Sequence, residues 1–112
     1  MIQTVIDAVN PKNTCFSTES MPWMIPTIPE EYLKLIKAVD RKQFCAHLDI
    51  IDMINTPERY FFSTEFLEKS FSLLGSYIRS CHLKDIRLLD DYTFCLKECA
   101  CGRAHSMCAA TW

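Results

Sequence analysis

Three short apolar segments of the chain each end in a residue whose side chain can bind a metal ion. These residues are Glu19, Asp49 and His82, and the predicted strands that carry them are 14–19, 43–49 and 77–82. The ligand residues follow one another at intervals of 30 and 33 residues, about the length of one strand-plus-helix unit. Because parallel strands joined by such units end at the same edge of a sheet, we expect the three side chains to converge. Two carboxylates and an imidazole at one edge can hold a divalent metal ion.

The segments between these strands have the spacing of helices. Residues 2–9 predict a short helix that ends at an Asn-Pro pair, because the residue before a proline disfavours helical backbone. Apolar residues recur at helical spacing in 29–40 and in 63–75, and 93–97 is a weaker candidate for a fourth strand. This order predicts an α/β fold with parallel strands, right-handed crossovers and outer helices. Two architectures stay open, namely part of a (β/α) barrel and a small open sheet.

The length and charge of the chain restrict its class. Its 112 residues suffice for one domain but are far short of the ~250 residues of a closed (β/α) barrel. The formal net charge is -2, and no basic stripe is evident, so phosphate-mediated nucleic-acid binding has little support. The N-terminus has no basic leader, and no segment approaches the ~18 apolar residues of a membrane span. We therefore expect a cytoplasmic protein without nucleic-acid or membrane partners.

Seven cysteines are many for a chain of this length. Cys15, Cys45 and Cys81 lie in the predicted strands, where a free thiol behaves as a small hydrophobic group. Since no secretory signal is evident, we expect these thiols to be reduced.

Further soft ligands lie near the C-terminus. Cys99, Cys101, His105 and Cys108 are residue types that bind structural zinc. Their spacing matches no standard zinc finger, so a zinc site and a tail of free thiols stand as alternatives.

Four blocks of the chain resemble a known family. The order and spacing of these blocks are similar to those of the xylose isomerase-like TIM-barrel sugar isomerases and epimerases. The blocks are ESMPWM (19–24), HLD (47–49), MINTPERY (53–60) and SCHLKD (80–85). The resemblance covers 1–98 and implies a partial (β/α) TIM barrel, about the fifth to seventh strands, with the preceding half absent. It implies that 99–112 are a divergent Cys-rich tail.

The resemblance also implies a reaction and a metal site. The family isomerises aldoses and ketoses, or epimerises ketoses, with Mn²⁺, Mg²⁺ or Co²⁺. Carried over position by position, it implies that Glu19 is a metal ligand and the acid/base, and that Asp49 and His82 are further ligands. It places His47 close to the substrate in a catalytic role. The metal would polarise a carbonyl and hydroxyl pair, and a carboxylate would move a proton between carbons through an enediolate.

Three further residues are expected to line the sugar site, namely Trp23, Lys84 and Asp85. The family's fourth ligand, a glutamate on the eighth strand, falls beyond the matched region, and we do not equate Glu98 with it. If metal binding requires the missing half of the barrel, this chain would have lost both the metal and the activity.

Two other functions are compatible with the same residues. Open sheet edges invite pairing with another chain, so the protein could be a non-catalytic barrel remnant that forms homo-oligomers. An endonuclease-IV-like phosphodiesterase would also use His, Asp and Glu at strand ends. That reaction requires more than the 3 histidines of this chain and a basic surface, so it ranks last.

Overall fold

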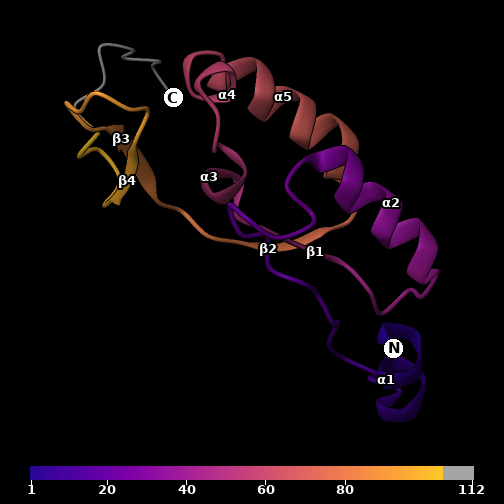
Figure 1. The fold of residues 1–112 in the computed structure, drawn as a ribbon. Helices are drawn as coiled ribbons and strands as arrows, with labels where there is room; N and C mark the ends of the chain where they lie inside the picture. Colours follow the sequence, from indigo (N-terminus) through magenta and orange to yellow (C-terminus); the bar gives the residue numbers. More distant parts are fainter. Residues whose placement is uncertain (105–112) are drawn as a thin grey trace.

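The computed structural model describes residues 1–104 of the chain (Figure 1). Three helices lie where the apolar periodicity predicts them, and the fold of the described residues is mixed α/β. The elements in chain order are α1 (Ile2–Val9), α2 (Pro29–Val39), β1 (Ala46–Leu48), α3 (Ile50–Met53), α4 (Pro57–Phe61), α5 (Ser63–Leu74), β2 (Ile78–Cys81), β3 (Asp85–Leu88) and β4 (Leu96–Cys99).

Parallel strands form the centre of the fold. β1 pairs with β2 in parallel, and His47 lies opposite Ser80. The segment 16–19 runs parallel to β1 and joins it through two isolated bridges, the second of which pairs Glu19 with His47. The predicted parallel pairing of the three segments is confirmed, and their carboxyl ends lie at one edge.

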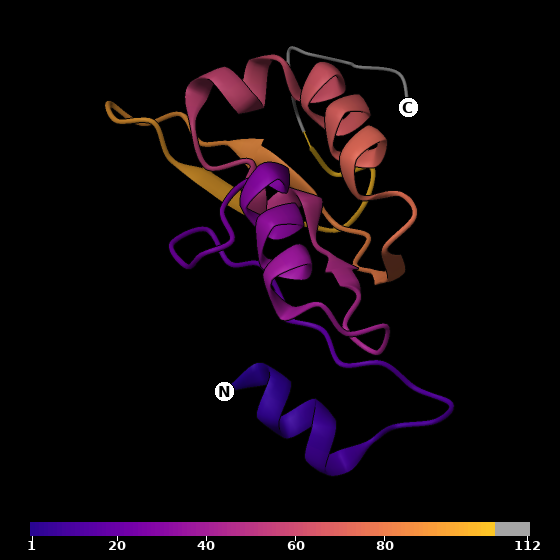
Figure 2. The same cartoon turned by 90° about the vertical axis from the view of Figure 1, so that its right-hand side faces the viewer.

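Helices α2 and α5 pack against each other and against these strands. Figures 1 and 2 show both helices on the same side of β1 and β2. Pro29 occupies the first turn of α2, where a missing N–H costs no helical hydrogen bond. Tyr32 and Ile36 then recur on the buried face of α2 and form the main core with Leu48 and Leu74. This apolar contact stabilises β1, because a strand of three residues has few ladder bonds of its own.

The predicted partial (β/α) TIM barrel is wrong, and no barrel is evident in the described residues. Parallel pairing stops at β2, and β3 and β4 form a separate antiparallel sheet. A parallel crossover takes a dozen or more residues, whereas only residues 89–95 connect β3 to β4. The weak strand predicted at 93–97 overlaps β4, but it closes a hairpin and does not continue the parallel sheet.

A second, smaller core lies between the β3–β4 hairpin and the helices that follow β1. Ile51, Ile54, Tyr60 and Ile86 are buried together, and the Tyr60 hydroxyl accepts a 3.3 Å hydrogen bond from the N–H of Leu88. Helices α3 and α4 carry two of these residues. Apolar periodicity does not reveal either helix, because each is shorter than two turns.

A disulfide bond joins the residues that directly precede the segment 16–19 and β1, at the ends of these strands away from the ligand residues. Cys15 is bonded to Cys45, and the N–H of Cys45 donates a 3.0 Å hydrogen bond to the carbonyl of Phe16. The expectation of reduced thiols is therefore wrong for this pair, because pairing of the two strands brings the sulfur atoms together. Cys81 is a free thiol, as expected.

Helix α1 contacts the C-terminal end of α2, at the other end of the molecule from the hairpin (Figure 2). Arg41 Nε lies 2.7 Å from Asp7 Oδ1, and Gln3 Nε2 donates a 3.0 Å hydrogen bond to the carbonyl of Val39. None of the helices within residues 1–104 combines the length and the apolar character needed to cross a membrane.

We expect loss of the disulfide to destabilise the fold. Because Cys15 and Cys45 are 30 residues apart, Cys45→Ser should lower the free energy of unfolding by about 3–4 kcal/mol, measured by urea unfolding. Cys81→Ser changes an exposed free thiol and should leave the midpoint unchanged. Equal losses in the two variants would contradict a stabilising role for the disulfide.

Candidate metal centre

The carboxyl edge of the parallel strands gathers the ligand residues predicted from the sequence. Glu19 ends the first strand segment and His47 lies in β1. Asp49 directly follows β1, and His82 directly follows β2. Because the three segments run in the same direction, their ends bring these four side chains to one place.

Asp49 is the most constrained of these residues, because its side chain is completely buried. It is the N-cap of α3, and its Oδ1 accepts a 3.3 Å hydrogen bond from the N–H of Asp52. Its Oδ2 lies 3.0 Å from His82 Nδ1. The hydroxyl of Ser20 donates a 3.0 Å hydrogen bond to the Asp49 carbonyl, which ties the end of the first strand to the end of β1.

The two histidines and Glu19 lie on the more exposed side of Asp49. His82 Nδ1 is 3.2 Å from Glu19 Oε1, and about half of each of these side chains is exposed. The rings of His47 and His82 meet edge to face, with centroids 4.4 Å apart. His47 Nδ1 is 2.6 Å from the hydroxyl of Ser80, so the contact with Ser80 fixes the orientation of the His47 ring.

Tyr32 holds together the two strands that carry Glu19 and His47. It is completely buried, and its hydroxyl donates to the carbonyl of Thr18 and accepts a 3.1 Å hydrogen bond from the N–H of His47. Helix α2 therefore positions the candidate ligands through one phenol, a contact that the sequence analysis does not include.

Lys84 is a cation at the centre of several carboxylates. Its Nζ lies 2.9 Å from Asp49, 2.8 Å from Asp52 and 2.6 Å from Glu98. Burial opposes the charge, but the hydrogen bonds with Asp52, Glu98 and Asp49 outweigh it and raise the pKa of Lys84 above its ordinary value. Lys84 is therefore a charged structural partner of these carboxylates, and its contact with a substrate stays a prediction.

Carboxylates exceed cations at this edge. Four carboxylates, those of Glu19, Asp49, Asp52 and Glu98, lie within reach of Lys84 or His82. Burial raises the pKa of Asp52, the hydrogen bond from Lys84 lowers it, and the charge of Asp49 raises it again, with a net upward shift. An excess of negative charge of this kind attracts cations.

Two combinations of side chains have the geometry of a metal site. In each, three ligand atoms lie within 4.8 Å of one another. The combinations are Glu19, His47 and His82 on the one hand, and Glu19, Asp49 and Asp52 on the other.

The first combination fits a divalent ion better. In the second, both oxygens of Asp49 are already engaged, Oδ1 by the N–H of Asp52 and Oδ2 by His82 and Lys84. Carboxylate and imidazole together suit Mn²⁺, Co²⁺ or Zn²⁺. Asp49 then supports the site through its contact with His82 Nδ1, an arrangement that orients a ligating imidazole.

Asp52 and Glu98 are the charged residues that the sequence prediction missed. Asp52 lies three residues after Asp49 in the first turn of α3, and this spacing places two side chains on the same side of a helix. That spacing is a signal that could have identified Asp52. Glu98 lies beside Lys84 because β4 folds back on β3. No local sequence pattern predicts this contact.

The other residues predicted to line the sugar site belong to two different cavities, because Asp85 lines one together with His82 and Trp23 lines another. Trp23 is 75% exposed in the loop after Glu19. Asp85 accepts hydrogen bonds from the N–H groups of Ile86 and Gly102, so it stabilises the hairpin. Within the alternative zinc site, Cys99 ends β4 and Cys101 lies in a turn. His105 and Cys108 lie outside the described residues.

Comparisons with known proteins do not assign the chain to a family. No protein-family model matches it, and neither a curated protein nor a solved structure matches it significantly. The resemblance to sugar isomerases, the sugar substrate and the cytoplasmic location therefore stay predictions.

We expect Lys84→Met to destabilise the fold strongly. The substitution leaves the buried carboxylates of Asp49 and Asp52 without their cation, which costs about 3–5 kcal/mol for a buried pair. Urea unfolding at pH 7 measures the loss, and Lys97→Met on the exposed side of β4 is the matched control. A similar small change in both variants would contradict the central role of Lys84.

The raised pKa of Asp52 predicts a pH dependence of stability. A carboxyl group whose pKa is raised by folding stabilises the folded state below its ordinary pKa of 3.8, and this contribution is lost as the pH rises through the folded pKa. As the pH rises from about 3 to 7, the native chain should therefore lose stability relative to Asp52→Asn, whose side chain does not ionise. Urea unfolding of both proteins across this pH range measures the difference. A pH-independent difference would contradict this expectation.

Proposed function

We propose that the chain binds a divalent metal ion through Glu19, His47 and His82 and uses this site for acid–base chemistry on a hydroxy-carbonyl compound. The observation that carries the proposal is the meeting of two imidazoles and a carboxylate within 4.8 Å beside a group of carboxylates with one lysine. Carboxylate and imidazole groups at this spacing are ligand types that divalent transition-metal ions and zinc accept.

The reaction that these residues support best is isomerisation or epimerisation of a sugar, the class implied by the sequence resemblance. A bound divalent ion would polarise the carbonyl and hydroxyl oxygens of the substrate. Glu19 is the candidate acid/base, because half of its side chain is exposed and can reach a carbon-bound proton. His47 would lie beside the same substrate, with its ring held by Ser80.

Asp49 acts as a positioning residue in this proposal. It is completely buried and contacts His82 Nδ1, so it sets the orientation of the His82 ring. Lys84 pairs with Asp49 and Asp52, which leaves Glu19 and the two histidines as the more accessible ligands. The site would therefore combine a rigid inner side with an open outer side.

Metal binding by the purified chain tests the proposal. We expect stoichiometric Mn²⁺ binding in calorimetry, weakened at least about tenfold by either His82→Ala or His47→Ala, because each change removes one of three ligands. Asp91→Asn, at an exposed carboxylate in the turn before β4, is the control. Loss of binding in Asp52→Asn with unchanged binding in His47→Ala would assign the ion to the carboxylate set and contradict our assignment. The absence of Mn²⁺ binding by the folded chain would contradict the whole proposal.

Self-association is a second candidate function. In the described residues β2 pairs only with β1, and 16–19 also pairs only with its neighbour in this sheet, so two strand edges are open. Open edges favour pairing with another chain, and a homo-oligomer could build its interface there. Light scattering at increasing concentration should show a mass above 13.0 kDa, and a monomer at every concentration would contradict this function.

A further inference from the structure

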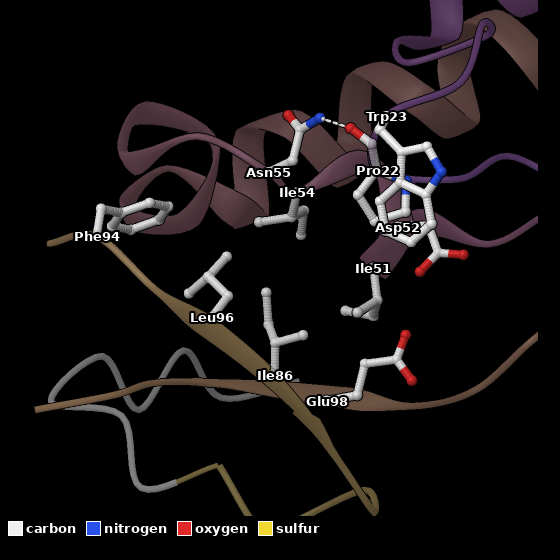
Figure 3. Close-up of a pocket in the computed structure, with 10 residues that line it drawn as sticks. All are labelled: Pro22, Trp23, Ile51, Asp52, Ile54, Asn55, Ile86, Phe94, Leu96 and Glu98. Atoms are coloured by element: carbon white, nitrogen blue, oxygen red, sulfur yellow. Dashed lines mark hydrogen bonds between the residues drawn. The ribbon is translucent and has the colours of Figure 1, made fainter. Parts of the chain in front are cut away.

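A small cavity opens beside the carboxylate cluster, on the side of the hairpin. Its volume is about 260 Å³, slightly below the ~300–1,000 Å³ of drug-sized pockets, so it suits a small ligand. Half of the ten residues in its wall are apolar residues of the second core and the hairpin (Figure 3). These residues are Ile51, Ile54, Ile86, Phe94 and Leu96.

The cavity is polar at one end only. Figure 3 shows the carboxylates of Asp52 and Glu98 toward the end at which Trp23 stands, whereas Phe94 lies at the opposite end. Lys84 contacts one oxygen of each of these carboxylates, but it is shared with Asp49. The polar end therefore keeps a net negative charge.

Asn55 is the remaining polar side chain at the cavity wall, and its hydrogen-bonding groups are engaged. Its Nδ2 donates a 2.5 Å hydrogen bond to the carbonyl of Pro22, the dashed line in Figure 3. Its Oδ1 accepts a 2.7 Å hydrogen bond from Arg59 Nη1. A polyhydroxylated ligand would find few partners on these walls, and unpaired hydroxyl groups are costly to bury.

We propose that this cavity binds a small amphiphilic amine. Its ammonium group contacts the second oxygens of Asp52 and Glu98, Oδ2 and Oε2, because Lys84 is hydrogen-bonded to Oδ1 and Oε1. Its apolar body packs toward Phe94. Charge complementarity selects a cationic head and disfavours an anion of the same shape. The aromatic ring of Trp23 at the charged end also favours a cation, because the face of an indole ring attracts positive charge.

This site is separate from the proposed function. The metal set consists of Glu19, His47 and His82, none of which lines the cavity. Asp52 connects the two sites, since it lines the cavity and lies beside Lys84 and Asp49. Because none of the three proposed metal ligands lines the cavity, binding of the amine can succeed or fail independently of Mn²⁺ binding.

A set of three probes tests the head and the body of the ligand. The chain, without added metal, is titrated with 2-phenylethylamine and followed by two-dimensional NMR of its backbone amides. The comparison probes are 3-phenylpropanoate, which has the same ring and an anionic head, and ethylamine, which has the head without the ring. We expect saturable shifts at Ile54, Ile86 and Leu96 with 2-phenylethylamine, and affinities at least about tenfold weaker for both comparison probes.

Two surface variants then locate the site. Glu98→Gln removes one negative charge at a side chain that is 60% exposed, so it should fold and bind 2-phenylethylamine about fivefold to tenfold more weakly. Phe94→Ala removes an apolar side chain at the end of the cavity away from the carboxylates. It should weaken the binding of 2-phenylethylamine but leave the binding of ethylamine unchanged. Glu68→Gln, at an exposed position of α5, is the matched control and should bind as the native chain does.

The binding results either support or overturn the amine site. Preference for the amine over the anion, together with weaker binding in Glu98→Gln, supports the site. Equal binding of amine and anion, equal affinities in Glu98→Gln and Glu68→Gln, or no shift at the cavity residues would overturn it. A Mn²⁺ titration of the same sample reports on the metal centre, so failure of the amine site would leave the proposed function standing.

Discussion

The completely buried carboxylate of Asp49 is the constraint on which the rest of the site depends. A buried charge is strongly unfavourable unless it is paired and hydrogen-bonded. Here Lys84 and His82 supply the partners, and the turn that opens α3 supplies an N–H. His82 and Lys84 both belong to the segment that links β2 to β3, so satisfying this one carboxylate fixes the end of β1 relative to the end of β2 and the start of the hairpin. The geometry of the candidate ligands follows from that requirement.

The residues that stabilise the ends of the parallel strands therefore also position the candidate metal ligands. The parallel strands are too short to define the site by their ladder bonds alone. Tyr32 and the Cys15–Cys45 disulfide hold the first strand beside β1, while packing of α2 and α5 holds β1 from one face. The exposed side of the site is left to Glu19 and the histidines. A buried carboxylate paired with Lys84 and His82, beside more accessible ligand residues, is the physical basis of the proposed metal centre.

The sequence predicted the elements with strong periodicity and the convergence of side chains that follow parallel strands. Helices α2 and α5, and the approach of Glu19 and Asp49 to His82, are of this kind. Local sequence patterns could not test the predicted barrel, because a barrel depends on how the chain pairs after β2. The chain forms an antiparallel hairpin there, which is incompatible with a continued parallel barrel. Glu98 and Lys84 meet only through that hairpin, so their pairing is a tertiary property without a local signal.

The most direct test of the central claim is the effect of substoichiometric Mn²⁺ on the proton NMR lines of the native chain. The paramagnetic ion broadens resonances close to it. We expect the resonances of the His47 and His82 ring protons to broaden first. The resonances of Tyr92, which is fully exposed in the hairpin turn, should stay sharp. Unchanged histidine lines, or equal broadening of all three rings, would contradict a metal site at the ends of the parallel strands.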